Sequence, residues 1–291
     1  MTLQRYIFFP NRSFFRNLFF ALSLFHNLSI RFFINKYHVE FVFIRFLCNF
    51  AQIMINMDTL LLILVAVLPA ALLWAYVWKK DKKKEPTSWL CKATIYGILI
   101  CFPVAFIETA ISTIMFSPYG GPTTLWGTTS MAFFVAAIPE ELFKLFALWL
   151  VLVRNPYFDE HFDGIVYAVC VGLGFAAIEN VHYLFGFRDE WMTVAAIRSL
   201  MAVPAHYAFA VLMGYYYSKY HFVDHSRKTA AMVIVAPVVC HGLYDALLMT
   251  SIVDEILGGV CVLVAIIGTI RLHIFARKKL LSMIETPQWE G

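Results

Sequence analysis

The sequence predicts an all-α fold, a polytopic transmembrane helix bundle with about seven spans from residue 57 onward. The chain has 291 residues, of which 61% are hydrophobic and only 14% are charged. Soluble domains carry about 25% charged residues, so this composition is typical of a protein embedded in a membrane. The net charge is a modest +4, and the basic residues gather at the ends of apolar runs. This pattern favours contact with membrane lipid and argues against binding of nucleic acid.

Seven apolar runs are long enough to cross the hydrocarbon core, which takes about 20 helical residues. They cover residues 58–78, 91–116, 130–153, 163–187, 191–217, 229–251 and 253–276. The loops between them are too short to fold separately. We therefore expect a single membrane domain over residues 57–276, followed by a tail over residues 277–291.

The connections between these runs alternate in charge. Lys and Arg crowd the first connection (79–84), the fifth (219–228) and the tail, whereas the second connection is uncharged and the sixth carries only two acids. Basic loops stay in the cytoplasm during insertion. Counted from Met57, the chain is therefore expected to start outside the cell membrane and to end with a cytoplasmic C-terminus.

Residues 1–56 differ in composition from the rest of the chain. They contain thirteen Phe, no Gly and a single acid, Glu40, and Asn and Arg interrupt their apolar stretches. Three interpretations stay open: one or two additional spans, a basic aromatic helix at the membrane interface, or an upstream extension that is not part of the native protein. We favour the extension, because the sequence from Met57 resembles a natural membrane-protein beginning.

Five charged side chains lie in the middle of apolar runs. They are Glu140, Glu141, Lys144, Glu179 and Asp245. An unpaired charge near the centre of a bilayer costs about 2.5–3.5 kcal/mol on insertion scales. The five groups must therefore face one another or a wet cavity, which predicts a polar site inside the membrane. Glu108 lies within the second run, and the sequence gives it no clear partner.

The first three charges belong to one helix. Glu140 and Lys144 are four residues apart and share a helix face, whereas Glu141 points about 100° away from Glu140 on a helix of 3.6 residues per turn. We expect Lys144 to hold one carboxylate and to leave the other free to take a proton, and either glutamate can be this base. The alternative is a salt bridge that only joins helices, but it leaves the second carboxylate without a partner.

Two later motifs supply further candidate groups. Phe175, Glu179 and Asn180 have the spacing FxxxEN, in which a carboxylate in apolar surroundings can act as a general acid or base. Asn180 could also donate a hydrogen bond to an oxyanion or orient a backbone. His241 and Asp245 are again four residues apart, so the carboxylate can fix the tautomer of the imidazole.

His206 is a second histidine in the middle of a span, and Arg198 lies two turns before it. Glutamates together with histidines and an aspartate suggest activated water. A glutamate takes the proton, His206 and His241 stabilise the oxyanion, and Asp245 orients His241. Two histidines and a carboxylate can also hold zinc. Because Lys144 lies close to the same groups, we expect no cofactor and keep a divalent metal as the alternative.

Three prolines inside spans precede these motifs by a few residues. They are Pro139, Pro204 and Pro237. Proline removes a backbone hydrogen bond and bends a helix, and such a bend can open room for water or substrate beside polar groups. A packing kink without functional meaning is the alternative interpretation.

The three motifs, in this order, resemble those of the PrsW family of intramembrane proteases. EEXXK matches residues 140–144, FXXXEN matches residues 175–180, and HXXXD matches residues 241–245. The stretch FDEHFDGIVYAVCVGLGFAAIEN (158–180) is also similar to the family. The resemblance covers roughly residues 60–275 of this sequence and leaves residues 1–56 without a counterpart.

The resemblance implies a multi-pass membrane peptidase, distantly related to the type II CAAX prenyl endopeptidases. It implies a single-span membrane protein as substrate, such as an anti-sigma factor cleaved in a site-1 type step. The implied catalytic residues are Glu140, Glu141, Lys144, Glu179, His206, His241 and Asp245, with Phe175, Asn180 and Arg198 in support. The wider relatives have a histidine where this chain has Glu179, so their mechanism transfers only in part.

Two other functions remain as alternatives. One is a non-catalytic membrane protein that uses its polar interior for binding or assembly. The other is proton- or ion-coupled transport, although the sequence has no evident inverted repeat.

Overall fold

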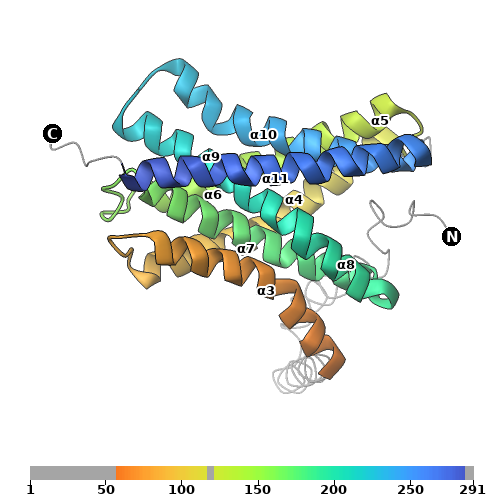
Figure 1. The fold of residues 1–291 in the computed structure, drawn as a ribbon, viewed down its shortest axis with the longest axis horizontal. Coiled ribbons are helices and arrows are strands. Elements are labelled where there is room, and N and C mark those ends of the chain that lie inside the picture. Colours follow the sequence, from red (N-terminus) through yellow and green to blue (C-terminus); the bar gives the residue numbers. More distant parts are fainter. Residues whose placement is uncertain (1–56, 117–120, 286–291) are drawn as a thin grey trace, which may run out of the picture.

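The computed structural model describes residues 57–116 and 121–285, so the interpretations of residues 1–56 lie outside the described part of the chain. Within that part all regular structure is helical (Figure 1). The elements are α3 (Met57–Lys80), α4 (Thr87–Phe116), α5 (Leu125–Ser130), η3 (Met131–Ala137), α6 (Ile138–Leu152), α7 (Asp163–Gly186), η4 (Arg188–Glu190), α8 (Trp191–Ile197), η5 (Arg198–Ala202), α9 (Val203–Phe222), α10 (Arg227–Met249), η6 (Thr250–Ile252) and α11 (Glu255–Glu285).

The predicted bundle of about seven spans is confirmed. Six helical segments of the described residues are long and apolar enough to cross a membrane. The seventh is the continuous run of α5, η3 and α6, which carries Glu140, Glu141 and Lys144 and is therefore less apolar than the others. The last span, α11, continues to Glu285, so residues 277–285 of the expected tail extend this helix.

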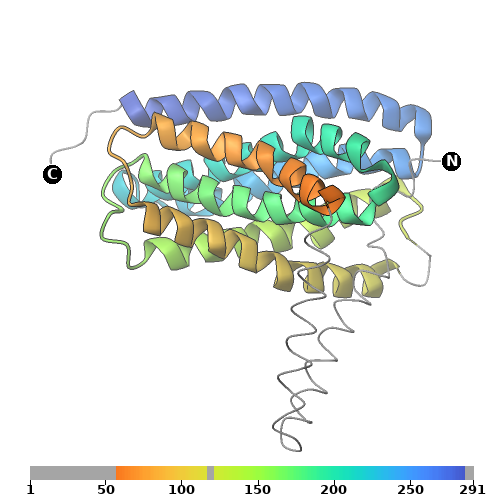
Figure 2. The same ribbon diagram turned by 90° about the horizontal axis from the view of Figure 1, so that it is seen from below.

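Helix α7 lies at the centre of the bundle. In its most apolar stretch 83% of the residues are buried, against 11% in α11, which lies along one outer face (Figure 2). α7 packs against α3, α4, α6 and α9. Glycines bring α4 and α7 together: a Cβ atom at Gly97 would lie 2.1 Å from the carbonyl oxygen of Val171. Such small residues let helix backbones approach closely in membranes.

The basic connections lie at one end of the bundle (Figure 1). Lys83 Nζ, between α3 and α4, is 2.6 Å from Asp159 Oδ2, between α6 and α7. Lys279, near the end of α11, donates a hydrogen bond of 3.3 Å to the Tyr215 hydroxyl, near the end of α9. The basic segments therefore share one side of the predicted membrane, as the alternation of loop charges requires.

Two turns of π-helix precede two of the three prolines. η3 ends two residues before Pro139, and η5 ends two residues before Pro204. The proline ring clashes with the carbonyl group four residues earlier, and the wider turn accommodates it with bonds to the fifth residue, such as Ile138 N–H to Phe133 O. Turns of this kind are frequent at functional sites. α10 remains α-helical through Pro237.

Candidate active site

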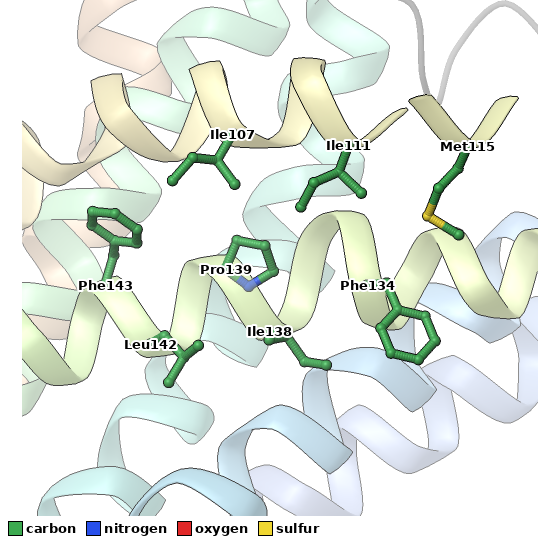
Figure 3. Close-up of a pocket in the computed structure, with 8 residues that line it drawn as sticks. All are labelled: Ile107, Ile111, Met115, Phe134, Ile138, Pro139, Leu142 and Phe143. Carbon is green, nitrogen blue, oxygen red and sulfur yellow. The ribbon is translucent and has the colours of Figure 1, made fainter. Parts of the chain in front are cut away.

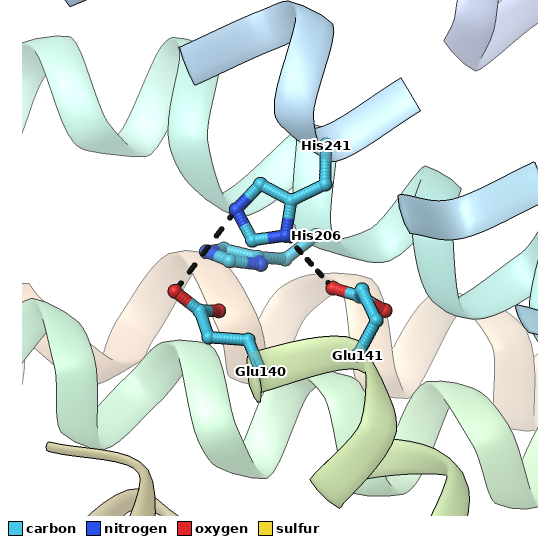
Figure 4. A group of neighbouring side chains, drawn as sticks. All are labelled: Glu140, Glu141, His206 and His241. Carbon is cyan, nitrogen blue, oxygen red and sulfur yellow. Dashed lines mark hydrogen bonds and ion pairs between the residues drawn. The ribbon is translucent and has the colours of Figure 1, made fainter. Parts of the chain in front are cut away.

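The ten candidate residues of the sequence form one connected network in the middle of the bundle. They come from α6, α7, η5, α9 and α10. Figure 4 shows two histidines, His206 and His241, above the paired glutamates Glu140 and Glu141. All four side chains are buried, and Glu141 has no exposed surface at all. The predicted polar site inside the membrane domain is therefore present.

Lys144 is the hub of this network. Its Nζ atom lies 2.8 Å from Glu140 Oε2, 2.9 Å from Glu141 Oε1 and 3.3 Å from His206 Nδ1. Our expectation that Lys144 holds one carboxylate and leaves the other free was wrong. Neighbours three and four residues apart both lie within reach of one helical side chain, so a single ammonium group neutralises both carboxylates.

The contacts of His206 define its tautomer. An ammonium group can only donate, so Nδ1 of His206 accepts from Lys144 and the ring proton sits on Nε2. Nε2 then donates to Glu179 Oε2 at 2.8 Å. His206 therefore connects the paired glutamates of α6, through Lys144, to the glutamate of α7.

Glu179 is held by two cationic or proton-donating neighbours. Besides His206, the terminal nitrogen of Arg198 lies 2.9 Å from its Oε2 atom. Arg198 Nε donates to Asn180 Oδ1 at 2.6 Å, and Asn180 Nδ2 donates to the carbonyl oxygen of Ala66 in α3 at 3.1 Å. Asn180 therefore anchors Arg198 to the backbone of α3, and of the two roles expected for it the backbone contact is the one formed.

His241 lies between carboxylates from two helices. Its Nδ1 is 2.9 Å from Glu141 Oε1, and its Nε2 is 4.0 Å from Glu140 Oε1 (Figure 4). Nε2 also lies 3.2 Å from Asp245 Oδ2. Carboxylate oxygens only accept hydrogen bonds. Nδ1 therefore donates to Glu141, and two further carboxylates face Nε2, which favours a proton on this nitrogen as well.

One further acid of the site, Glu108 of α4, had no role predicted from its spacing. This partly buried side chain interacts electrostatically with Glu140, Glu179, His241 and Lys144. Its proximity follows from the packing of α4 against α6 and η3. The only sequence signal was its charge within an apolar run.

These features define the class of protein: a polytopic membrane protein that keeps acids, imidazoles and an ammonium group together in its interior, an arrangement suited to acid–base chemistry on water. Residues 85–270 match the model of the "PrsW family intramembrane metalloprotease". The chain therefore belongs to the PrsW family and is a membrane-embedded peptidase. This result favours the protease over the non-catalytic and transport alternatives.

Curated relatives support the same family. The chain is 35% identical to Protease PrsW of Oceanobacillus iheyensis over 62% of its own length and 80% of that protein. It is 34% identical to Protease PrsW of Geobacillus kaustophilus, with coverage of 65% and 80%, and 33% identical to that of Bacillus subtilis, with coverage of 64% and 82%. No solved structure matches the chain.

The family description names a metal, and four donors in the site could hold one. Ligand atoms of Glu140, Glu141, His206 and His241 all lie within 4.8 Å of one another, and nitrogen and oxygen donors suit zinc. Three of these residues, however, already face the ammonium group of Lys144. A dication beside this ammonium would be strongly repelled. With Lys144 in this position, the donor set does not fit a divalent ion.

Proposed function

We propose that the chain hydrolyses a peptide bond of a single-span, anti-sigma-factor-like membrane protein in a site-1 type cleavage, using water activated by its Glu/His cluster. The observation that carries this proposal is the position of Lys144, whose ammonium group contacts Glu140, Glu141 and His206 at 2.8–3.3 Å. It supplies a positive charge where a metal protease would carry its ion.

Glu140 is the better candidate for the general base. Glu141 Oε1 is already shared by Lys144 and His241. Glu140 Oε1 lies 4.0 Å from His241 Nε2, too far for a direct hydrogen bond. A water molecule about 2.8 Å from each atom would bridge them in a bent arrangement. Such a water would be oriented by a base on one side and by a proton donor on the other.

In the proposed reaction, the water oxygen attacks the carbonyl carbon of the scissile bond while Glu140 takes a proton from the water. The N–H of His241 Nε2, which orients the water beforehand, donates a hydrogen bond to the oxyanion as it forms. When the tetrahedral intermediate collapses, the C–N bond breaks and Glu140 passes its proton to the leaving nitrogen. The products are a free carboxyl group and a free amine, and the enzyme returns to its starting state.

The remaining site residues would act by positioning these groups. Both nitrogens of His206 are engaged, by Lys144 and by Glu179. We therefore assign His206 to orienting Lys144, in place of the oxyanion role that we expected from the sequence. Glu179 and Arg198 complete this support from α7 and η5, and Phe175 lies under the ammonium group of Lys144 at 4.2 Å.

We further propose that the basic end of the bundle faces the cytoplasm, so that the C-terminus is cytoplasmic. The support is the charge of its connections, residues 79–84 and 219–228, together with the positive-inside rule. Reporter domains fused after Phe222 and after residue 291 test this orientation, because both should be active only on the cytoplasmic side.

The function is tested with purified protein in liposomes. The substrates are a library of Lys-flanked single-span peptides whose sequences vary in the residues next to the membrane surface. We expect the wild type to cleave some of them, and Glu140→Gln and His241→Ala to lower kcat by at least about 100-fold, the usual scale of a lost general acid or base. A matched control is Phe106→Leu, on the lipid-facing surface of α4. Variants as active as the wild type would refute the Glu/His mechanism.

The absence of a metal requirement is tested in the same assay. We expect full cleavage after exhaustive chelation and only traces of bound metal in elemental analysis. Loss of cleavage on chelation, followed by recovery with zinc, would contradict the role given to Lys144.

A further inference from the structure

An apolar groove runs beside the helix that carries the paired glutamates. Its volume is about 710 Å³, within the range of ligand pockets, and it lies between α4 and the η3–α6 segment. Figure 3 shows Ile107, Ile111 and Met115 of α4 in a row opposite Phe134, Pro139 and Leu142. Pro139 and Leu142 flank Glu140 and Glu141 in the sequence, so the groove and the proposed catalytic centre share one turn of helix α6.

Glu108 shares a helix face with two residues of this groove. It stands three residues before Ile111 and seven residues before Met115, on the same side of α4. It also faces the charges of Glu140, Glu179, His241 and Lys144. Among the described residues no hydrogen bond or ion pair to Glu108 is found, although every other acid of the cluster has one.

A carboxylate without a partner beside an apolar groove limits which kind of molecule the groove can bind. A lipid acyl chain would fill the apolar part but offers no donor to Glu108. A protease must instead bind a stretch of unwound substrate backbone, and in a membrane each unpaired N–H group costs several kcal/mol. A polypeptide therefore suits both features: its apolar side chains can pack against the groove walls, and its N–H groups can donate hydrogen bonds to Glu108.

Resting on the proposed function, we propose that this groove binds the unwound substrate segment beside the scissile bond. An apolar substrate side chain lies between α4 and the η3–α6 segment, and Glu108 accepts a hydrogen bond from a substrate backbone N–H. Glu108 is then a substrate-positioning residue, and the groove selects for apolar residues next to the cleaved bond.

Photo-crosslinking tests the occupant of the groove without requiring cleavage. A benzophenone amino acid replaces Ile111 in a Glu140→Gln background, and the matched control carries it at Ile114, which is 79% exposed on the same helix. The probes are the Lys-flanked single-span peptides in phosphatidylcholine vesicles. We expect peptide adducts at Ile111 well above those at Ile114, and their loss on adding Glu108→Ala. Lipid adducts alone at Ile111, or peptide adducts unchanged by Glu108→Ala, would overturn the proposal.

Kinetics on a peptide that the wild type cleaves give an independent test. Glu108→Ala should raise KM by about 10-fold, equivalent to about 1.4 kcal/mol, with little change in kcat. Glu108→Gln keeps an acceptor oxygen, so it should restore most of the affinity. A fall in kcat with unchanged KM, or equal behaviour of the Ala and Gln variants, would contradict the assignment. If the wild type cleaves no peptide at all, the proposed function fails, and crosslinking at Ile111 still decides the occupant of the groove.

Discussion

His241 Nδ1 lies 2.9 Å from Glu141 Oε1, and this contact joins α10 to α6 across 100 residues of sequence. The other ring nitrogen faces Asp245 of α10 at 3.2 Å. Carboxylates on two helices therefore fix the orientation of one buried imidazole. Because the direction of Nε2 depends on how α6 and α10 pack, the geometry of the site and the packing of the bundle are coupled.

The two glutamates of the pair should differ in their effect on catalysis. Gln in place of Glu141 still accepts from Lys144 and His241 but without charge, so we expect kcat to fall by about 10- to 100-fold, the scale of a small misplacement of reacting groups. Glu140→Gln removes the proposed base and should cost more. Steady-state kinetics in liposomes measure both variants. A larger loss of kcat for Glu141→Gln would instead identify Glu141 as the general base.

Replacing Lys144 by Met should strongly destabilise the fold. The change leaves Glu140 and Glu141 buried side by side without their cation, and breaking a buried ion pair in this way costs about 3–5 kcal/mol. Unfolding in mixed detergent and SDS measures the free energy. The combination Glu140→Gln, Glu141→Gln and Lys144→Met should recover most of the stability but no activity. A single Lys144→Met variant as stable as the wild type would contradict this network.

The sequence predicted the spans and the members of the cluster, because hydropathy and i, i+4 spacing are local properties of a helix. It did not predict that Lys144 binds both glutamates. Positions 140 and 141 are equally within reach of the side chain at position 144, and its contacts depend on the helices that pack around it. The hydrogen bond from Asn180 to the backbone of Ala66 and the position of Glu108 depend on packing between distant helices. No spacing within one span carries that information.

Arg198 should not be replaceable by Lys. Its Nε donates to Asn180 while a terminal nitrogen pairs with Glu179, and a lysine ammonium cannot reproduce this planar, two-sided geometry. We expect Arg198→Lys to lower kcat about 10-fold, at the lower end of the range for supporting residues. Arg188→Lys serves as the control, because Arg188 contacts Thr59 at the end of the bundle. Equal activity of the Arg198→Lys and Arg188→Lys variants would show that Arg198 does not help to position the site residues.

Adding one methyl group at Gly97 should loosen the contact between α4 and α7. The new Cβ atom would lie 2.1 Å from the Val171 carbonyl oxygen, a backbone atom that cannot move aside cheaply. Overpacking of this kind costs about 1–3 kcal/mol. Gly268→Ala is the matched control, since a Cβ atom there meets nothing within 4 Å. Thermal unfolding should separate the two variants, and an equal Tm would contradict the close approach of these helices.

Stability should depend on pH through Glu85, which lies between α3 and α4 and accepts a hydrogen bond from the Tyr167 hydroxyl. Burial raises the pKa of Glu85 from 4.5 to about 7. The hydrogen bond from Tyr167 and the charge of Lys83 lower this pKa by smaller amounts, and Asp81 and Asp159 raise it. Between these two values the folded protein binds the proton more tightly than the unfolded chain, so the free energy of unfolding falls as pH rises through this window.

Glu85→Gln stays neutral and should flatten this part of the profile. Unfolding in detergent at a series of pH values measures both slopes, with the solvent-exposed Glu255→Gln variant as control. An unchanged slope in Glu85→Gln would show that another group carries the dependence.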